Sequence, residues 1–223
     1  MELLDGNDEH VRGLADSWFE HLRDGQRPRA VSMCCSDSRV SQELMWSVDE
    51  PGWLFTPSTI GNQVWDRVDG RLVVDGSVLY PMEYAETEVV VVVGHTGCAA
   101  LTAAFEAVEN ETEHPVGVSK WVELLVPVVE DALDAGVVEG SEEDVVHRLV
   151  EHNVDRQVEF LLESDDVSDD VSVYGFVYDL HLAYGDVDGR AYLVNADGER
   201  DVDVLRDLVP DEQVCSVVRL NVV

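Results

Sequence analysis

Two short stretches of the chain hold the side chains best suited to chemistry. Residues 31–40 read VSMCCSDSRV, and residues 89–98, about 60 positions further on, read VVVVVGHTGC. Each stretch begins with an apolar run typical of a buried strand and ends in groups that can bind a metal. Cys35, His95 and Cys98 supply two thiolates and one imidazole, a donor set that suits Zn²⁺ and leaves a fourth position for water or a carboxylate. We interpret these three side chains as one zinc site.

Asp37 and Arg39 follow Cys35 at intervals of two residues. An arginine beside an aspartate keeps the carboxylate ionised and orients it through charge-assisted hydrogen bonds. Zinc lowers the pKa of a bound water towards ~7. Asp37 could accept a proton from such a water, or bind the metal itself as a fourth ligand.

Taken singly, these residues have simpler explanations. Asp37 alone would more often cap a helix that begins near Ser38, Arg39 would be an ordinary ion-pair partner, and Cys35 would be a buried thiol. A single His-x-x-Cys after a strand is more often a coincidence than a pair of ligands. Only the combination at two strand ends favours a metal site.

The remaining cysteines and histidines are weaker candidates. Four cysteines are too few and too irregularly spaced for a disulfide scaffold. We expect Cys34 to point to the other face of its strand and pack there, and Cys215 to be a thiol of the core. The other histidines are predicted to lie mainly at the surface, where one could carry protons; they are His10, His21, His114, His147, His152 and His181.

The elements that must position the site follow an alternating pattern. Five consecutive valines, Val89–Val93, are typical of a strand buried on both faces of a parallel sheet. Functional groups of open α/β sheets collect at the carboxyl ends of the strands, so neighbouring strands would bring Cys35 and His95 together. Strands are predicted at 30–34, 53–56, 89–93, 171–178 and 191–195, and helices at 8–23, 40–48, 76–87, 99–108, 119–135 and 142–163. The fold class expected is α/β, with a central mostly parallel β-sheet flanked by helices and an N-terminal helical arm.

No linker divides the chain, so we expect a single domain over residues 1–223. Residues 1–25 form its N-terminal helical arm, in which Trp18 and Phe19 contribute to an apolar face that would pack on the fold or on a second subunit. Residues 200–223 form a C-terminal extension, and its apolar end, VCSVVRLNVV, is predicted to be an edge strand or an intersubunit arm.

The charge is strongly acidic. Forty-seven acidic residues against 14 basic ones give a net charge of −33. The acids are interleaved with apolar residues, which favours an acidic surface on a folded core over disorder. Self-repulsion of this size destabilises a compact state unless salt screens it, and in about 1 M salt the Debye length falls to about 3 Å. We therefore hypothesise a halophile-like protein, and we expect no nucleic-acid partner because no basic patch is present.

Two further features concern location. No apolar run approaches the ~18–20 residues that a membrane helix needs. The N-terminus, MELLDGNDEH, lacks a basic segment followed by an apolar one. We expect a cytoplasmic protein with no membrane partner.

The motifs around the proposed ligands resemble those of a known family. Cys-Ser-Asp-Ser-Arg, followed about 60 residues later by Gly-His-Thr-x-Cys, resembles the signature of the β-class carbonic anhydrases. Weaker similarities lie at Gln26 in its GQxP context and in the segments 82–85, 151–158 and 175–179. The resemblance covers roughly residues 8–200.

The resemblance implies the reversible hydration of CO₂ to bicarbonate and a proton at a zinc ion held by Cys35, His95 and Cys98. Asp37 and Arg39 would orient the zinc-bound hydroxide that attacks CO₂. It also implies dimers, sometimes paired into tetramers, with the N-terminal helix embracing the partner subunit. Substrate or product would further contact Gln26, and the pocket walls would include Val40, Ile60 and Gly97.

Two departures from the family pattern keep alternatives open. Ser58 and Thr59 stand where members usually carry Arg-Asn, and Ser32 stands where some carry a tryptophan, so inhibition by bicarbonate at a second site is not expected. A hydrolase of COS or CS₂ would share the same ligands. A weakly active relative with a structural or bicarbonate-binding role is the other alternative, although a structural metal site would need neither Asp37 nor Arg39.

Overall fold

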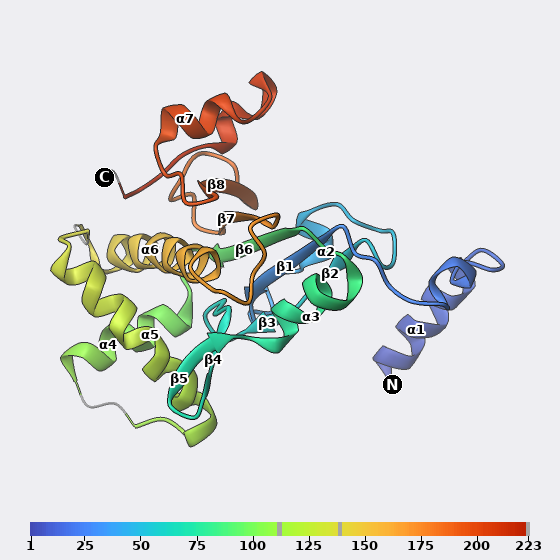
Figure 1. Cartoon of the computed structure of the whole chain (residues 1–223), viewed down its shortest axis with the longest axis horizontal. Coiled ribbons are helices and arrows are strands. Elements are labelled where there is room, and N and C mark those ends of the chain that lie inside the picture. The colour runs from blue at the N-terminus through green and yellow to red at the C-terminus, as the bar shows by residue number, and fades with distance from the viewer. Residues whose placement is uncertain (111–112, 138–139, 222–223) are drawn as a thin grey trace.

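A mostly parallel sheet runs through the centre of the computed structural model, which describes residues 1–110, 113–137 and 140–221 (Figure 1). In spatial order its strands are β2 (Leu54–Phe55), β1 (Ala30–Cys35), β6 (Val89–His95), β7 (Ser172–Asp179) and β8 (Arg190–Ala196), and β3 (Ser58–Thr59) also pairs with β1. Only β8 is antiparallel to its neighbour in this sheet. The expected α/β fold class is confirmed.

β1 and β6 lie side by side, with Val31 opposite Val90 and Cys34 opposite Val93. All six residues of β1 are buried, and so are the last four of β6. Parallel strands covered on both faces bury both sets of side chains, which explains the apolar runs in the sequence. Because β1 and β6 are parallel neighbours, both strands end at the same edge of the sheet.

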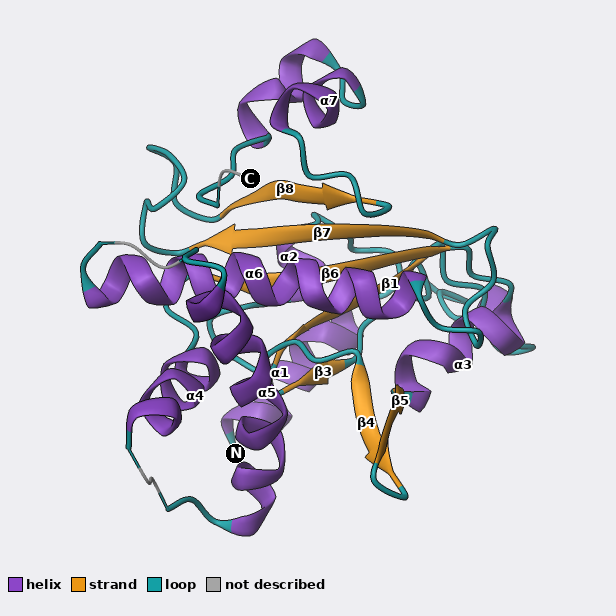
Figure 2. Ribbon diagram, turned by 60° about the vertical axis from the view of Figure 1, so that its left-hand side comes forward, coloured by secondary structure: helices purple, strands orange, loops and turns teal. Residues whose placement is uncertain are grey.

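Three long helices pack together beside the sheet (Figures 1 and 2): α4 (Ala99–Glu109), α5 (Val116–Asp134) and α6 (Glu142–Leu162). α6 contacts β6 and β7, and two glycines allow the approach. A Cβ on Gly94 would lie 2.8 Å from Val150 Cγ1, and one on Gly175 would lie 2.6 Å from Val154 Cγ1. No helix in the described ranges is long and apolar enough to cross a membrane.

The segment between β1 and β6 contains elements that were only partly predicted. The expected helices at 40–48 and 76–87 are present as α2 (Gln42–Met45) and α3 (Gly76–Ala85). A hairpin of β4 (Trp65–Val68) and β5 (Arg71–Val74) was not predicted. Its turn is Asp69-Gly70, and both residues have positive φ, the conformation that Asp-Gly favours in two-residue hairpins.

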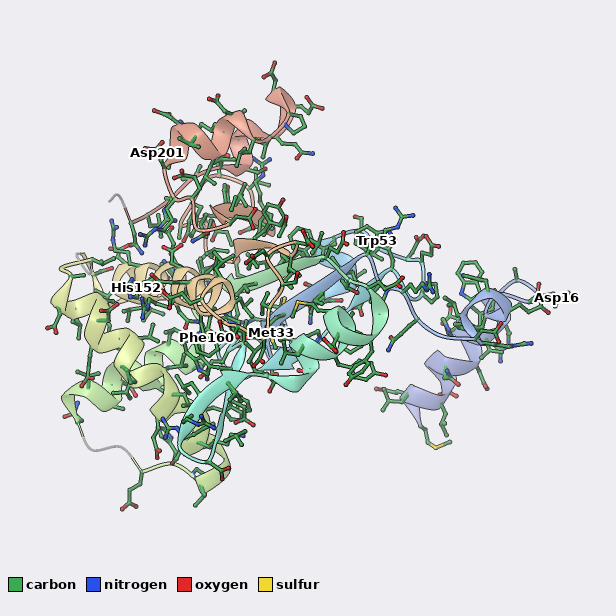
Figure 3. The ribbon with its side chains drawn as sticks, in the orientation of Figure 1. Asp16, Met33, Trp53, His152, Phe160 and Asp201 are labelled. Atoms are coloured by element: carbon green, nitrogen blue, oxygen red, sulfur yellow. The ribbon has the colours of Figure 1, made fainter. Side chains whose placement is uncertain are left out.

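The N-terminal arm lies apart from the body of the molecule, and Asp16 marks its far side (Figures 1 and 3). The prediction of one helix over residues 8–23 was wrong. α1 covers Glu2–Gly13, and a short 3₁₀ turn, η1, covers Glu20–Leu22. Ser17 between them has a φ of 65°, a left-handed conformation that no helix tolerates. α1 has no buried residue, while Trp18 and Phe19 remain exposed.

The C-terminal extension folds back on its own chain. It forms α7 (Val202–Asp207) and the 3₁₀ helix η2 (Asp211–Ser216), and only Val217 makes a bridge, to Leu193 of β8. The predicted edge strand is not formed in the described part of this segment, whose end is bonded to α6. The alternative of an intersubunit arm stays a prediction, and residues 222 and 223 lie outside the described residues.

A buried ion cluster makes that attachment. The Arg219 guanidinium lies 2.6 Å from Asp155 Oδ2 and 3.1 Å from Glu151 Oε1. The backbone N–H groups of Leu220 and Asn221 donate to Glu151 at 2.8 and 2.9 Å. All three charged side chains are almost fully buried, so each depends on the others for compensation.

Candidate metal centre

Three potential ligands meet where β1 and β6 end. Cys35 is the last residue of β1, His95 is the last residue of β6, and Cys98 is the N-cap of α4. Their ligand atoms all lie within 4.8 Å of one another, and all three residues are buried. The expectation that adjacent strands bring Cys35 and His95 together is therefore met by the fold.

The donor atoms fit a tetrahedral zinc ion. Two sulfur atoms that each lie about 2.3 Å from one tetrahedral zinc are about 3.8 Å apart, and Cys35 Sγ lies 3.8 Å from Cys98 Sγ. His95 Nδ1 lies 3.0 Å from the carbonyl oxygen of Thr96, which leaves Nε2 facing the thiols. Within the described residues Nε2 is buried without a hydrogen-bond partner, as expected of an atom reserved for a metal.

The surroundings favour an ionised thiol at this position. The hydrogen bond from Cys98 lowers the pKa of Cys35, and so do the nearby His95 ring and the hydrogen bond from the backbone N–H of Gly61 at 3.3 Å. The pKa of Cys98 is raised well above the usual value, because Cys98 is bonded to Cys35 and is buried. Cys35 is thus the thiol of the pair that ionises more readily, and a bound metal would take both as thiolates.

Asp37 and Arg39 form a bidentate ion pair at the rim of the group of three potential ligands. Arg39 Nε and Nη2 donate to the two carboxylate oxygens of Asp37 at 2.9 and 2.8 Å, and the Arg39 backbone N–H donates to Oδ1 at 2.9 Å. These bonds hold the pKa of the Asp37 carboxyl well below its usual range. Asp37 Oδ2 lies 3.6 Å from His95 Nε2, so the carboxylate faces the ligand cluster. It caps no helix, because α2 begins only at Gln42.

The predicted pocket residues lie around the same point. Gly97 accepts a hydrogen bond from Arg39 Nη2 at 3.3 Å. Its φ is +64°, and a Cβ there would lie 2.4 Å from the His181 ring, so only glycine fits. Ile60 packs against the core next to Gly61, and Val40 is half-buried in the turn after Asp37. Their contact with substrate stays a prediction.

Gln26 is not brought to the ligands within one chain. It precedes β1, whereas Cys35 ends it, and the strand alone spans about 16 Å. Gln26 instead lines a surface hollow with His21 and Trp53. A role in substrate binding therefore requires a second copy of the chain.

The other cysteines and histidines differ partly from expectation. Cys34 is fully buried, and burial raises its pKa to about 12, so it packs as predicted and lies outside the ligand group. Cys215 is exposed on η2, so its assignment to the core was wrong. His147 was expected at the surface but is only 4% exposed.

A polar network behind the ligands was missed by sequence reasoning. The buried Asp179 carboxylate accepts the Thr96 hydroxyl at 3.2 Å and backbone N–H groups of His181, Ala183 and Tyr184 at 2.9 to 3.2 Å. These bonds fix the segment after β7 against the loop that carries two of the ligands. The only available signal was a tyrosine-aspartate pair ending a predicted strand, which by itself indicates no role.

The loop beside the ligands is firmly bonded although it lacks the Arg-Asn pair. Gln42 Nε2 donates to Ser58 Oγ and to Pro57 O, both at 3.0 Å. Thr59 Oγ1 donates to the Gln63 carbonyl oxygen at 2.9 Å. Ser58 and Thr59 thus make hydrogen bonds that hold the loop in place beside the ligand group.

Comparison with known proteins points to one family. The profile described as "Carbonic anhydrase" matches residues 30–185. Carbonic anhydrase 2 of Mycobacterium tuberculosis is 33% identical over 137 residues, which cover 57% of this chain and 61% of the relative, less than two thirds of its length. The carbonic anhydrase of Synechocystis sp. is 30% identical over 203 residues, covering 84% of this chain and 72% of the relative. The structure of the β-carbonic anhydrase CcaA superposes with a TM-score of 0.68 at 25% identity, covering 86% of each chain.

Proposed function

The chain belongs to the carbonic anhydrase family, and from that premise we propose that it catalyses the reversible hydration of CO₂ to bicarbonate and a proton as a β-class enzyme. One observation carries the proposal: Cys35, His95 and Cys98 form a buried ligand group with Asp37 at its rim. Zinc bound there would supply Lewis-acid activation of water near neutral pH.

Each side chain has a distinct task in this proposal. Cys35, His95 and Cys98 would hold the metal. Asp37 stays ionised at neutral pH, so it would accept a hydrogen bond from the attacking water and fix its orientation, or would itself bind the metal. Arg39 holds Asp37 in place and is itself anchored on Gly97 O.

Substrate would bind next to this pair. Val40 and Ile60 supply apolar walls that suit CO₂ and exclude bulk water, and Gly97 allows a close approach of the backbone. Gln26 of a partner subunit would hold bicarbonate.

We propose a homodimer, or a homotetramer made of dimers, formed by the N-terminal arm of residues 1–25. α1 has no buried residue in the single chain. An apolar groove of about 550 Å³, lined by Trp46, Trp53 and Phe176 among others, offers a surface for a second copy. Deleting residues 1–25 should therefore lower the number of chains per particle, measured by sedimentation. An unchanged number would refute the role of the arm.

A halophile-like, cytoplasmic enzyme is proposed from the composition. The net charge of −33 supports a setting in which salt screens self-repulsion. We treat residues 1–223 as one domain. The described part of its C-terminal extension, residues 200–221, is bonded to α6 through Arg219, Leu220 and Asn221.

The test is stopped-flow hydration of CO₂ by zinc-loaded protein in concentrated KCl, together with sulfide release from COS. Rapid hydration with slow release of sulfide is expected. Faster COS hydrolysis would favour the hydrolase alternative. A fully zinc-loaded protein that accelerates neither reaction would leave only the structural or bicarbonate-binding role.

A further inference from the structure

One sulfur of the ligand group accepts a hydrogen bond from a distant loop. The backbone N–H of Gly61 donates to Cys35 Sγ at 3.3 Å, across 26 positions of the chain. The other two ligands are held locally, because His95 is bonded to the carbonyl oxygen of the next residue and Cys98 begins α4. The contact between Gly61 and Cys35 therefore depends on how the loop is held in the folded chain.

The loop backbone at Gly61 is unusual. Gly61 and Asn62 have φ values of 77° and 47°, a left-handed conformation that glycine and asparagine adopt more readily than other residues. A Cβ on Gly61 would lie 2.7 Å from Leu125 Cδ1, so only glycine lets the backbone come this close to α5. The two residues form a turn rather than part of a strand or helix, so side-chain bonds must hold it in place.

Asn153 of α6 supplies those bonds. Its Nδ2 donates to Gly61 O at 3.1 Å and to Asn62 Oδ1 at 3.2 Å, and its Oδ1 accepts from Gln157 Nε2 at 3.0 Å. Gln157 lies one turn further along the same face of α6, and its Oε1 accepts the backbone N–H of Val64 at 2.8 Å. Asn62, Asn153 and Gln157 are each at most 1% exposed. A buried chain of three amides thus joins α6 to the loop.

The two ends of this amide chain fix its direction. The backbone N–H of Val64 can only donate, so Gln157 must turn its oxygen to Val64 and its NH₂ group to Asn153. The carbonyl oxygen of Gly61 can only accept, so it must face the NH₂ group of Asn153. Both requirements agree. The chain is therefore satisfied in one orientation only, which favours a specific tie between α6 and the loop over a chance contact.

We propose that Asn153 is a positioning residue for the metal site, because it fixes Gly61 so that the Gly61 N–H points at the Cys35 sulfur. A hydrogen bond to a thiolate stabilises the negative charge on the sulfur and holds the sulfur in place for the metal. Asn153 acts on zinc binding only through Gly61. The inference rests on the zinc site of the proposed function and not on which reaction the zinc serves.

The experiment compares Asn153→Leu with the wild-type protein. Leucine has nearly the same size and shape as asparagine but cannot donate a hydrogen bond. We expect the dissociation constant for zinc, measured by competition with a chromophoric chelator, to rise about 10–100-fold. In protein loaded with cobalt instead of zinc, the cobalt–thiolate charge-transfer band should move to lower energy, because the sulfur has lost a bond that stabilised its electrons.

Asn195→Leu is the matched control. Asn195 is 2% exposed, donates to Asp155 at 2.8 Å and accepts the backbone N–H of Gly198 at 2.9 Å. Its replacement removes a buried amide on β8 rather than one bonded to the loop beside the ligands. The control should unfold more easily than the wild-type protein but keep its zinc dissociation constant and its cobalt band.

A second measurement uses the wild-type protein alone, so it does not depend on the folding of a variant. With an NMR-active isotope of cadmium in the site, the amide proton of Gly61 should show a scalar coupling to the metal through Cys35 Sγ. Absence of this coupling would refute the hydrogen bond and with it the role of Asn153.

The remaining outcomes separate the two proposals. If Asn153→Leu keeps the zinc dissociation constant and the cobalt band of the wild-type protein, the positioning role is refuted. If Asn195→Leu weakens zinc binding as much as Asn153→Leu does, the effect is general destabilisation and the role is refuted too. A wild-type protein that binds no zinc would refute both proposals. One that binds zinc but hydrates no CO₂ would refute the proposed reaction and not the role of Asn153.

Discussion

Replacing Arg219 by methionine should destabilise the protein strongly without touching the metal site. The Arg219 side chain is 2% exposed and is the cation facing both Glu151 and Asp155. A methionine fills much of the same space but leaves two carboxylates buried without a positive partner. Burial already raises the pKa of Glu151 despite Arg219, so loss of the arginine leaves its charged form still less favourable.

The expected magnitude follows from this geometry. Removing one partner of a buried ion pair costs about 3–5 kcal/mol. For a chain of this size that corresponds to a fall in Tm of roughly 6–20 °C. Arg156→Met is a matched control on α6, because its pair with Glu159 is 45% and 48% exposed; such surface pairs contribute about 1 kcal/mol or less.

Urea unfolding in constant KCl is the suitable assay, because urea is uncharged and leaves the screening unchanged. Adding Glu151→Gln to Arg219→Met should recover part of the lost free energy of unfolding, since it removes one uncompensated charge. If Arg219→Met unfolds at the same urea concentration as the Arg156→Met control, the ion cluster does not hold the C-terminal extension.

Three further predictions concern the site, the charge and pH. Asp37→Ala should keep bound zinc, measured by atomic absorption, but lower CO₂ hydration about 10²-fold; unchanged hydration would refute its orienting role. The wild-type protein should melt at a clearly higher temperature in about 2 M than in about 50 mM KCl, where the Debye length is longer, and equal melting temperatures would refute the halophile hypothesis. Because the pKa of His147 is lowered in the folded chain, the unfolded chain binds more protons there, so stability should fall as the pH drops below about 6.5. His147→Asn should flatten that part of the curve in urea titrations, and a curve of unchanged slope would contradict the role given to its burial.

The parts of the site that the sequence predicted depend on local patterns. The valines before His95 and the apolar run before Cys35 each mark a buried strand, and adjacent parallel strands have their carboxyl ends at one edge. Asp37 and Arg39 are close in sequence, so their pairing needed no knowledge of the fold. The gathering of Cys35, His95 and Cys98 and the pairing of Asp37 with Arg39 could therefore be predicted, whereas the distances between these groups could not.

The features that were missed depend on contacts between distant residues. Arg219 meets partners in α6 more than 60 positions earlier, and no local pattern shows that the tail turns back. His147 sits on a helix rich in charge, and its burial follows from the segment after β7. The break of the N-terminal helix at Ser17 is a backbone conformation that serine seldom adopts, so helical spacing gave no warning of it.

The single most direct test of the central claim is to measure zinc content and CO₂ hydration in the same preparation while zinc is removed by a chelator and then restored. The account predicts one zinc ion per chain, a hydration rate that falls in proportion to the zinc lost, and recovery of both when zinc is returned; in Cys98→Ser both should be low throughout. Hydration that persists after the zinc is gone, or full zinc retention in Cys98→Ser, would contradict it.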